Sequence, residues 1–334
     1  RRRFVRAVAR ALARFHARMP AGPATGRAVD ALLDAIAATF PEPGPAAVDV
    51  GTEPEALREA ARWQREFVER HAALLEERVR QQRVRDGRGE LVLDHAFVDD
   101  DREVHLIGRL DAPLALRSAD VCADVASFAV ELAAAGRADH AELFLAEYAR
   151  RANDFDLYPL VDFYASLVAS TRARLERWCA QQFAASVSER RRRVAVARRY
   201  AVLATAVRHR PIVPPVVVAI GGEVATGKST ASKWISRRLG APVVNTDRTR
   251  EYLLGGKPDG APHEVHWERA YHPGFGERVY TEVLRRGEAV LSSGRPVLLD
   301  GGFRSAAQRA RARGLARRFG LPCLFVEVRA PRDE

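Results

Sequence analysis

The sequence has few cysteines and no long apolar run. Its 334 residues include three cysteines, Cys122, Cys179 and Cys323, which are odd in number and far apart. That spacing excludes a disulfide framework and a cysteine-rich zinc site, and it favours a reducing cytoplasm as the setting. The densest apolar run, Val216–Ile220, is far shorter than the roughly 20 residues of a membrane helix. A membrane-spanning protein is therefore not expected.

Lysine is also scarce. Only three of the 54 basic residues are lysines, Lys228, Lys233 and Lys257. The formal net charge is +11, but so strong an arginine bias is typical of a genome-wide compositional preference. The densest basic runs, 190–193 and 309–318, are interleaved with apolar residues in helical stretches, which favours solvated helix faces over an anionic-partner surface. A nucleic-acid partner is therefore not expected.

The first 210 residues have mostly helical patterns. Three arginines open the sequence without an initiator methionine or a signal peptide, so we expect a trimmed or partial chain. Apolar residues then recur at helical spacing on one face, at Phe4, Val8, Leu12, Phe15 and Met19. A polar-rich helix is expected over about 53–82, two short strands over 91–98 and 103–106, and further helices from 120 to 207. The tryptophans Trp63, Trp178 and Trp234 are interpreted as packing residues.

The character of the sequence changes at a proline-rich stretch, residues 210–215. Prolines exclude helical continuation there, so we place a domain boundary between residues 210 and 211. Strands are expected at 216–220, 242–245, 296–300 and 323–328, and they alternate with helices at 228–239, 248–254, 276–292 and 305–319. The sequence thus predicts a mainly α-helical domain, 1–210, followed by an α/β domain with a parallel sheet, 211–334.

A phosphate-binding pattern, Gly-x-x-x-x-Gly-Lys-Ser, spans residues 222–229 between an expected strand and an expected helix. Glycines let the backbone turn tightly so that successive N–H groups point at a phosphate, and the helix adds its positive N-terminal end. Lys228 is expected to reach the β- and γ-phosphates, and the Ser229 hydroxyl to bind Mg²⁺. The predicted nucleotide-binding residues are Gly222, Val224, Ala225, Thr226, Gly227, Lys228, Ser229 and Thr230.

Two acidic residues and one arginine complete the predicted site. Asp300 ends an apolar strand, where parallel sheets place ligand-binding groups, and we expect it to bind Mg²⁺ through water rather than cap the strand. Asp247 follows the second strand and is a candidate to orient or deprotonate an acceptor hydroxyl, the alternative being an N-cap. Arg250, one turn later, is a candidate to hold an anionic group, the alternative being a surface arginine.

Residues 212–329 resemble the P-loop, AAA-type ATP-binding kinases of small molecules that are related to gluconate kinase and zeta toxins. The residues that carry this similarity are 219–222 together with the phosphate-binding pattern that follows, residues 246–250, Tyr271 with residues 279–280, and residues 299–304. The resemblance implies phosphorylation of a small-molecule hydroxyl by ATP and Mg²⁺, with Asp247 as the base. It also implies a lid with transition-state arginines after the fourth strand, and the sequence ends at Glu334. We expect that the natural chain continues, or that this chain binds nucleotide and turns over poorly.

Residues 1–207 resemble the helical, protein-kinase-like C-lobe of aminoglycoside phosphotransferase-like kinases, most clearly at 83–91 and 116–121. Such a lobe followed by a P-loop kinase resembles a bacterial bifunctional aminoglycoside phosphotransferase/ATP-binding arrangement. The positions of the catalytic Asp, the metal-binding Asn and the second metal-binding Asp hold Glu90, His95 and Gly108. The resemblance therefore implies a catalytically inactive, pseudokinase-like lobe, which binds a ligand or positions the second domain.

Two other functions stay open at this stage. A nucleotide-binding regulatory or scaffold protein would need neither Asp247 nor a lid, and a polynucleotide end kinase would need a continuous basic channel. The histidines His263, His266 and His272 have poor zinc spacing, so we interpret them as belonging to a solvent-facing or substrate-side loop.

Overall fold

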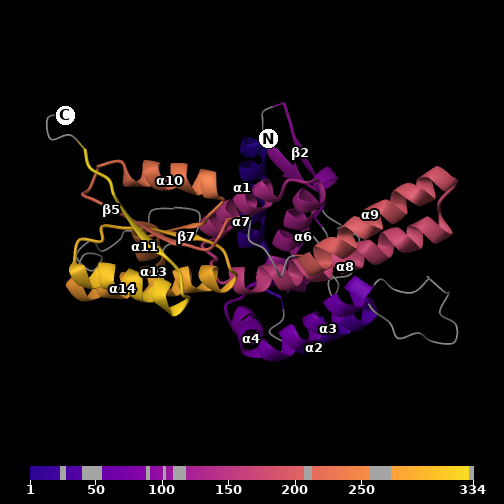
Figure 1. Ribbon diagram of the computed structural model, residues 1–334, viewed down its shortest axis with the longest axis horizontal. Helices are drawn as coiled ribbons and strands as arrows, with labels where there is room; N and C mark the ends of the chain where they lie inside the picture. The colour runs from indigo at the N-terminus through magenta and orange to yellow at the C-terminus, as the bar shows by residue number, and fades with distance from the viewer. Residues whose placement is uncertain are drawn as a thin grey trace. The chain divides into compact units, whose positions relative to one another are not determined.

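The computed structural model of the chain describes residues 1–22, 28–39, 55–87, 91–100, 103–107, 118–206, 213–255 and 272–330 (Figure 1). The chain divides into two compact units, each made of separate segments. The α/β unit comprises Arg1–Ala17, Glu142–Pro159 and Pro211–Glu334, and the helical unit comprises Arg18–Ala141 and Leu160–Arg210. The α/β unit thus includes two stretches that precede the proline-rich segment.

The helical unit is built mainly from long helices. They are α2 (Ala28–Thr39), α3 (Glu55–Arg70), α4 (Ala72–Arg80), α6 (Val121–Ala134), most of α8 (Tyr158–Gln182) and α9 (Val187–Ala206). Stacked Phe67 and Phe163 rings lie in its core, 4.9 Å apart. Two buried polar side chains there form a short series of hydrogen bonds: Gln64 Nε2 donates to Ser166 Oγ at 2.9 Å, and the Ser166 hydroxyl donates to the Ala204 carbonyl at 2.7 Å. Such pairing offsets the cost of burying polar atoms.

Two short antiparallel pairs accompany these helices. β1 (Val84–Asp86) pairs with β4 (Ser118–Asp120), and β2 (Ala96–Val98) pairs with β3 (Val104–Leu106). The expected hairpin is therefore present, although its first strand is short because Leu93–His95 form a 3₁₀ turn. The single helix expected over 53–82 is wrong, since α3 ends at Arg70, α4 begins at Ala72, and His71 lies in a turn between them.

The α/β unit contains a four-stranded parallel sheet in the order β6-β7-β5-β8 (Figure 1). Its strands are β5 (Val217–Gly221), β6 (Val243–Asn245), β7 (Val297–Asp300) and β8 (Cys323–Glu327). The helices are α10 (Lys228–Leu239), α11 (Thr246–Leu253), α13 (Pro273–Ser292) and α14 (Ala306–Arg318). Because β-branched and leucine residues fill β5 and β7, these strands are buried on both faces, as parallel sheets require.

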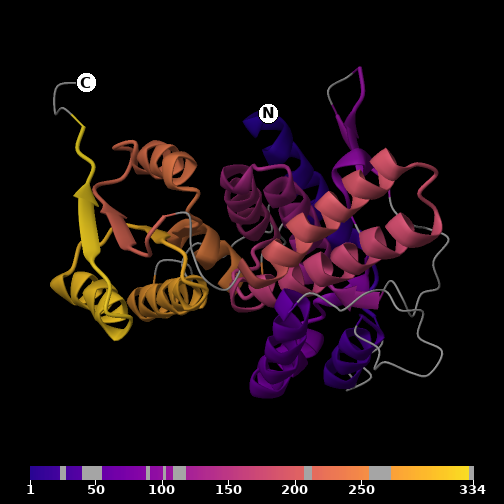
Figure 2. The ribbon, with the colours of Figure 1, turned by 45° about the vertical axis from the view of Figure 1, so that its right-hand side comes forward.

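Alternate residues of the central strands face opposite helices. Val218, Ile220 and Leu298 form one apolar cluster with Ile235 and Leu239 of α10. On the other face, Val297 and Leu299 approach Gly287 of α13, where an added Cβ would lie 3.1 Å from Leu299 Cδ2. Figure 2 shows the sheet from a second direction, with β8 at its edge. The fold class predicted from the sequence, a helical part followed by an α/β part with a parallel sheet, is confirmed.

Two earlier helices belong to this α/β unit in whole or in part. α1 (Arg2–Arg18) packs against α7 (Ala138–Ala152), which belongs to this unit from Glu142 onwards, and His16 Nδ1 lies 2.7 Å from the Tyr148 hydroxyl. The buried face of α1 includes Val5, Val8 and Leu12, so the helical stripe expected from the sequence is present with its centre slightly shifted.

Two of the three tryptophans that were interpreted as packing residues are exposed, so that interpretation is wrong for them. Trp178 and Trp234 are 48% and 59% exposed, and only Trp63 is half-buried, against Phe67. The guanidinium of Arg238 lies over the Trp234 ring at 4.9 Å, which covers one face of that indole. Within the described residues, no helix has the length and apolar content that crossing a membrane requires.

Candidate nucleotide-binding site

The loop of residues 222–227 turns tightly between β5 and α10. Gly222, Ala225 and Gly227 have φ of +139°, +66° and +88°, and the conformation of Gly222 is one that essentially only glycine adopts. A Cβ on Gly222 would lie 2.3 Å from the Val328 carbonyl oxygen, so no larger side chain fits there. Gly227 is the N-cap of α10 and its carbonyl accepts from Thr230 N at 2.9 Å. The two N–H groups of α10 that precede Thr230, those of Lys228 and Ser229, stand at the helix N-terminus, where an anion is favoured.

Lys228 and Ser229 begin helix α10. The Lys228 ammonium donates to the Glu223 carbonyl, and the Thr226 hydroxyl donates to the same oxygen at 2.9 Å. Ser229 and Thr230 are exposed on the first turn, as are Val224 and Ala225 in the loop. The Glu223 carbonyl thus holds the loop together from inside, while the exposed residues on its outer side are accessible to a ligand.

Asp300 lies beside the loop at the carboxyl end of β7. It pairs in register with Ile220 of β5 on one side and with Asn245 of β6 on the other, and it is 3% exposed. Asn245 Nδ2 donates to Asp300 Oδ2 at 2.9 Å. Burial raises the pKa of the Asp300 carboxyl despite this hydrogen bond, because desolvation disfavours the charged form. A carboxylate in this condition is stabilised by a nearby cation.

Asp247 and Arg250 lie on helix α11, which follows β6. Asn245 is the N-cap, since its Oδ1 accepts from the N–H groups of Asp247 and Arg248 at 3.0 Å each. The alternative interpretation of Asp247 as the cap is therefore wrong. The Asp247 side chain is 75% exposed, and its Oδ1 accepts from Arg250 Nη1 at 2.8 Å. The charge of Asp247 raises the pKa of Asp300 and that of Lys228 lowers it, after the larger effect of burial, so both charges act on the Asp300 carboxyl.

Three further residues shape the site and were not assigned a role in it from the sequence. Asn245 links Asp300 to the start of α11, and the buried Ser232 hydroxyl donates to the Lys228 carbonyl at 2.9 Å. The Tyr280 hydroxyl accepts from Phe303 N at 3.0 Å and fixes the turn that follows Asp300. An asparagine between a strand and a helix is a typical N-cap and was a readable signal. Ser232 and Tyr280 carry no comparable local signal.

Some predicted positions lie outside the described residues. These are Glu90, Gly108, His263, His266 and Tyr271. His272 is described and caps α13, where its Nδ1 accepts from Gly274 N at 3.3 Å. Arg309 donates to the carbonyls of Phe303 and Arg304, at 2.7 Å each.

The residues present fit a nucleotide with its magnesium ion. The described part of the chain contains no cluster of three or more His, Cys, Asp and Glu side chains that could hold a metal alone. Magnesium bound with a nucleotide needs only one or two protein ligands, because phosphate oxygens and water complete its octahedral shell. Ser229 and Asp300 are oxygen donors of the preferred kind, and Ser229 lies exposed on the first turn of α10, whose N-terminus favours an anion.

Comparison with known proteins finds a family similarity for the part of the chain that carries this site. Residues 217–334 match the family described as "AAA domain". The chain is 33% identical over 252 residues to an uncharacterized protein of Mycobacterium bovis and to uncharacterized proteins of two Mycobacterium tuberculosis strains. Those residues are 75% of this chain and 49% of each relative, so the chain spans about half the length of the curated relatives it matches. No solved structure matches the chain.

The family match supports nucleotide binding and, at a coarse level, phosphotransfer by the C-terminal part of the chain. The resemblance of residues 1–207 to aminoglycoside phosphotransferase-like kinases receives no support from these matches and stays a prediction.

Proposed function

We propose that the α/β unit binds ATP with Mg²⁺ at the 222–230 loop and transfers the γ-phosphate to a hydroxyl group of a small molecule. One observation carries this proposal. The tight loop at the end of β5 lies beside a buried carboxylate, Asp300, and both lie near an exposed carboxylate, Asp247. Phosphate cradle, metal ligand and acceptor base are the parts that phosphoryl transfer requires.

The nucleotide side of the mechanism uses the loop and the two metal ligands. Backbone N–H groups at the start of α10 would hold the phosphates, and Lys228 would exchange the Glu223 carbonyl for β- and γ-phosphate oxygens. Ser229 directly and Asp300 through water would hold Mg²⁺, which neutralises charge on the transferring phosphoryl group. The raised pKa of Asp300 supports this role, because a cation restores the stability of its charged form.

The acceptor side uses Asp247 and Arg250. Asp247 is exposed and can reach an acceptor hydroxyl, while the less exposed Arg250 holds the carboxylate by an ion pair of 2.8 Å. The hydroxyl oxygen forms a bond to the γ-phosphorus as the bond between that phosphorus and the β–γ bridging oxygen breaks. The hydroxyl proton passes to Asp247 and the electron pair of the broken bond leaves with ADP.

Calorimetric titration of ATP with Mg²⁺ into the full chain tests the binding step. Lys228→Ala should weaken binding by about a hundredfold, since charge-assisted contacts to phosphate are lost. Lys233→Ala is the matched control, because Lys233 is exposed on the same helix and lies outside the loop. Equal affinity in all three proteins would refute the proposed site.

Measurement of ADP release with sugar, nucleoside and aminoglycoside acceptors tests the transfer step. Acceptor-stimulated release that Asp247→Asn reduces about a hundredfold or more would support a kinase. Binding without stimulated release would favour instead a nucleotide-binding regulatory or scaffold protein.

We also propose that residues 1–210 form a pseudokinase-like lobe. If this lobe does not bind ATP, the titration should give one ATP per chain rather than two.

A further inference from the structure

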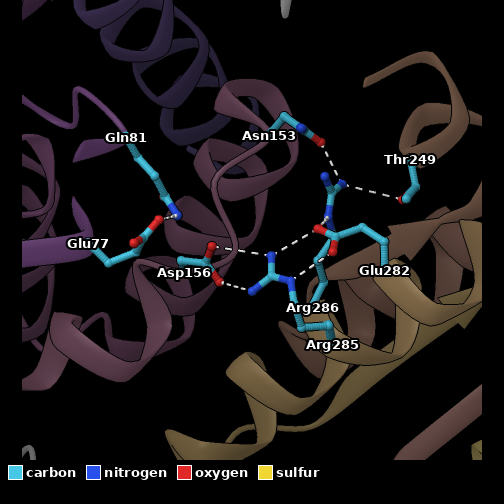
Figure 3. Close-up of polar contacts among 8 residues, drawn as sticks. All are labelled: Glu77, Gln81, Asn153, Asp156, Thr249, Glu282, Arg285 and Arg286. Atoms are coloured by element: carbon cyan, nitrogen blue, oxygen red, sulfur yellow. Dashed lines mark hydrogen bonds and ion pairs between the residues drawn. The ribbon is translucent and has the colours of Figure 1, made fainter. Parts of the chain in front are cut away.

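Arg286 is a charged side chain in the interior of the α/β unit. It lies on α13 and is 3% exposed. Its Nε donates to Glu282 Oε1 at 2.8 Å, and its Nη1 donates to Asn153 Oδ1 at 2.8 Å and to Thr249 Oγ1 at 3.3 Å (Figure 3). The guanidinium also lies over the rings of Phe155 and Tyr252. One buried group therefore joins α13, α11 and the turn that follows α7.

Burial of a guanidinium is costly unless its planar donors are all used, so a buried arginine indicates a geometric requirement. Lysine would keep the positive charge but lose the planar guanidinium, whose N–H groups donate to Glu282, Asn153 and Thr249 at the same time. Figure 3 shows the guanidinium of Arg286 pointing between Asn153 and Thr249. The orientation of the Arg286 guanidinium is therefore fixed by two segments of the chain, the turn after α7 and helix α11.

The hydrogen bonds continue from Arg286 to the candidate magnesium ligand. The buried Thr249 hydroxyl donates to the Asn245 carbonyl at 2.8 Å. Asn245 in turn donates from Nδ2 to Asp300 Oδ2 at 2.9 Å, and its Oδ1 caps α11. A continuous series thus runs from Asn153 through Arg286, Thr249 and Asn245 to Asp300.

Asn153 is held in place by the end of α7. Its φ is +50°, a left-handed conformation that asparagine adopts more readily than most residues, and Asp154 N donates to the Ala149 carbonyl at 3.0 Å. The same helix end holds α11 a second time, because Arg248 Nη1 donates to the Arg150 carbonyl at 2.8 Å. Residues 150–153 therefore contact the helix that carries Asp247 directly, and Asp300 through the series.

We propose that Arg286 is a positioning residue for the metal-binding side of the site, and that residues 150–153 set its position. Through Thr249 and Asn245 it fixes the Asp300 carboxylate and the first turn of α11. This role rests on the proposed function, because Asp300 matters in this way only if the site binds ATP with Mg²⁺. The turn after α7, far from the loop in sequence, thereby becomes part of the nucleotide site.

Arg285 provides the matched control. It is the neighbouring residue on α13 and also contacts the turn after α7, with Nη1 and Nη2 at 2.7 and 3.2 Å from the Asp156 carboxylate. Its side chain is half exposed, and its described contacts are to Asp156 and Glu282 and include none to α11. Loss of Arg285 loosens the same turn without breaking the series to Asp300.

The test measures how much Mg²⁺ strengthens ATP binding to the full chain. The variants are Arg286→Lys and Asn153→Gly, the second because glycine keeps the left-handed backbone and removes only the amide. Each should reduce the gain in ATP affinity due to Mg²⁺ by about tenfold, as loss of outer ligand-orienting groups does, with metal-free ATP affinity within about twofold. Arg285→Lys should leave both quantities unchanged.

A second readout needs no nucleotide. In ¹⁵N spectra of the ligand-free chain, the Asn245 side-chain amide should shift in Arg286→Lys and Asn153→Gly, and should stay in place in Arg285→Lys. An unchanged Mg²⁺-dependent gain, or an equal loss in the Arg285 control, would overturn the positioning role alone. Absence of ATP binding by the natural sequence would overturn the proposed function and this role with it.

Discussion

Gly222→Ala tests the physical basis of the phosphate loop. The φ of +139° at Gly222 costs a residue with a Cβ about 1–3 kcal/mol. The new Cβ would also lie 2.3 Å from the Val328 carbonyl oxygen, far inside van der Waals contact, so the backbone after β8 must move. That movement strains the hydrogen bond from Val328 N to the Gly221 carbonyl, 2.9 Å long and worth about 1 kcal/mol. The total cost is therefore about 2–4 kcal/mol.

The strain can be relieved in two ways that separate assays distinguish. If the loop distorts, ATP affinity should fall by about 30-fold to 1,000-fold, the equivalent of that free energy. If the loop keeps its shape, urea unfolding should show the same loss in stability instead. Both assays are made on one protein preparation. The loss of ATP-binding free energy and the loss of unfolding free energy should together equal the cost of the substitution.

Gly294→Ala is the control for the loop substitution. Gly294 also has a positive φ, +73°, but a Cβ there would meet no atom within 4 Å. We expect a loss of about 1 kcal/mol in stability and no change in ATP affinity. Gly222→Ala with nearly natural stability and ATP affinity within about threefold would refute the argument from steric contact.

Three other substitutions test buried groups. Arg78→Met should destabilise the chain by about 3–5 kcal/mol in urea unfolding, because it leaves the Asp120 carboxylate, whose Oδ1 is 2.6 Å from Arg78 Nη2, buried without its cation. Asp300→Asn should raise the melting temperature of the ligand-free chain at pH 7, since burial raises the pKa of Asp300 and its charged form destabilises the folded state above that pKa. That gain should disappear as the pH falls below about 4, where the carboxyl is protonated in both states. Tyr280→Phe should cost about 1–3 kcal/mol in urea unfolding, because Phe303 N loses its acceptor.

Each of these results has a contrary outcome. Arg78→Met with natural stability would show that Asp120 finds other partners, and a scan of Asp300→Asn with no pH-dependent difference would show that this carboxyl is well solvated. Unchanged stability of Tyr280→Phe would show that water satisfies Phe303 N.

Much of the α/β unit was predictable because its signals are local. Short apolar runs mark β5 and β7, and the glycine-rich loop fixes both its own turn and the start of α10 at Lys228. The position of Asp300 follows from the rule that parallel strands present ligand-binding groups at their carboxyl ends. These features need information from only a few neighbouring residues.

The remaining features depend on contacts between distant residues. Helical spacing places Trp178 and Trp234 on a helix but does not say which face meets solvent, and both proved exposed. The choice between Asn245 and Asp247 as the cap depended on where β6 ends in register with β7. Arg286 has the pattern of a solvated helix residue, and its burial depends on Asn153, 133 positions earlier.

The assembly of the α/β unit from three separated segments has a consequence for synthesis of the chain. Asn153 and Phe155 leave the ribosome before Arg286 exists, and the two ends of the Asn153 contact are 133 residues apart. At about 5–20 residues per second, translation takes roughly 7–27 seconds to cover that distance. Throughout this interval the end of α7 and the turn after it have apolar and polar groups with no partner on α13. The nascent chain therefore carries an incomplete surface, open to chaperones or to misassociation, until α13 has emerged.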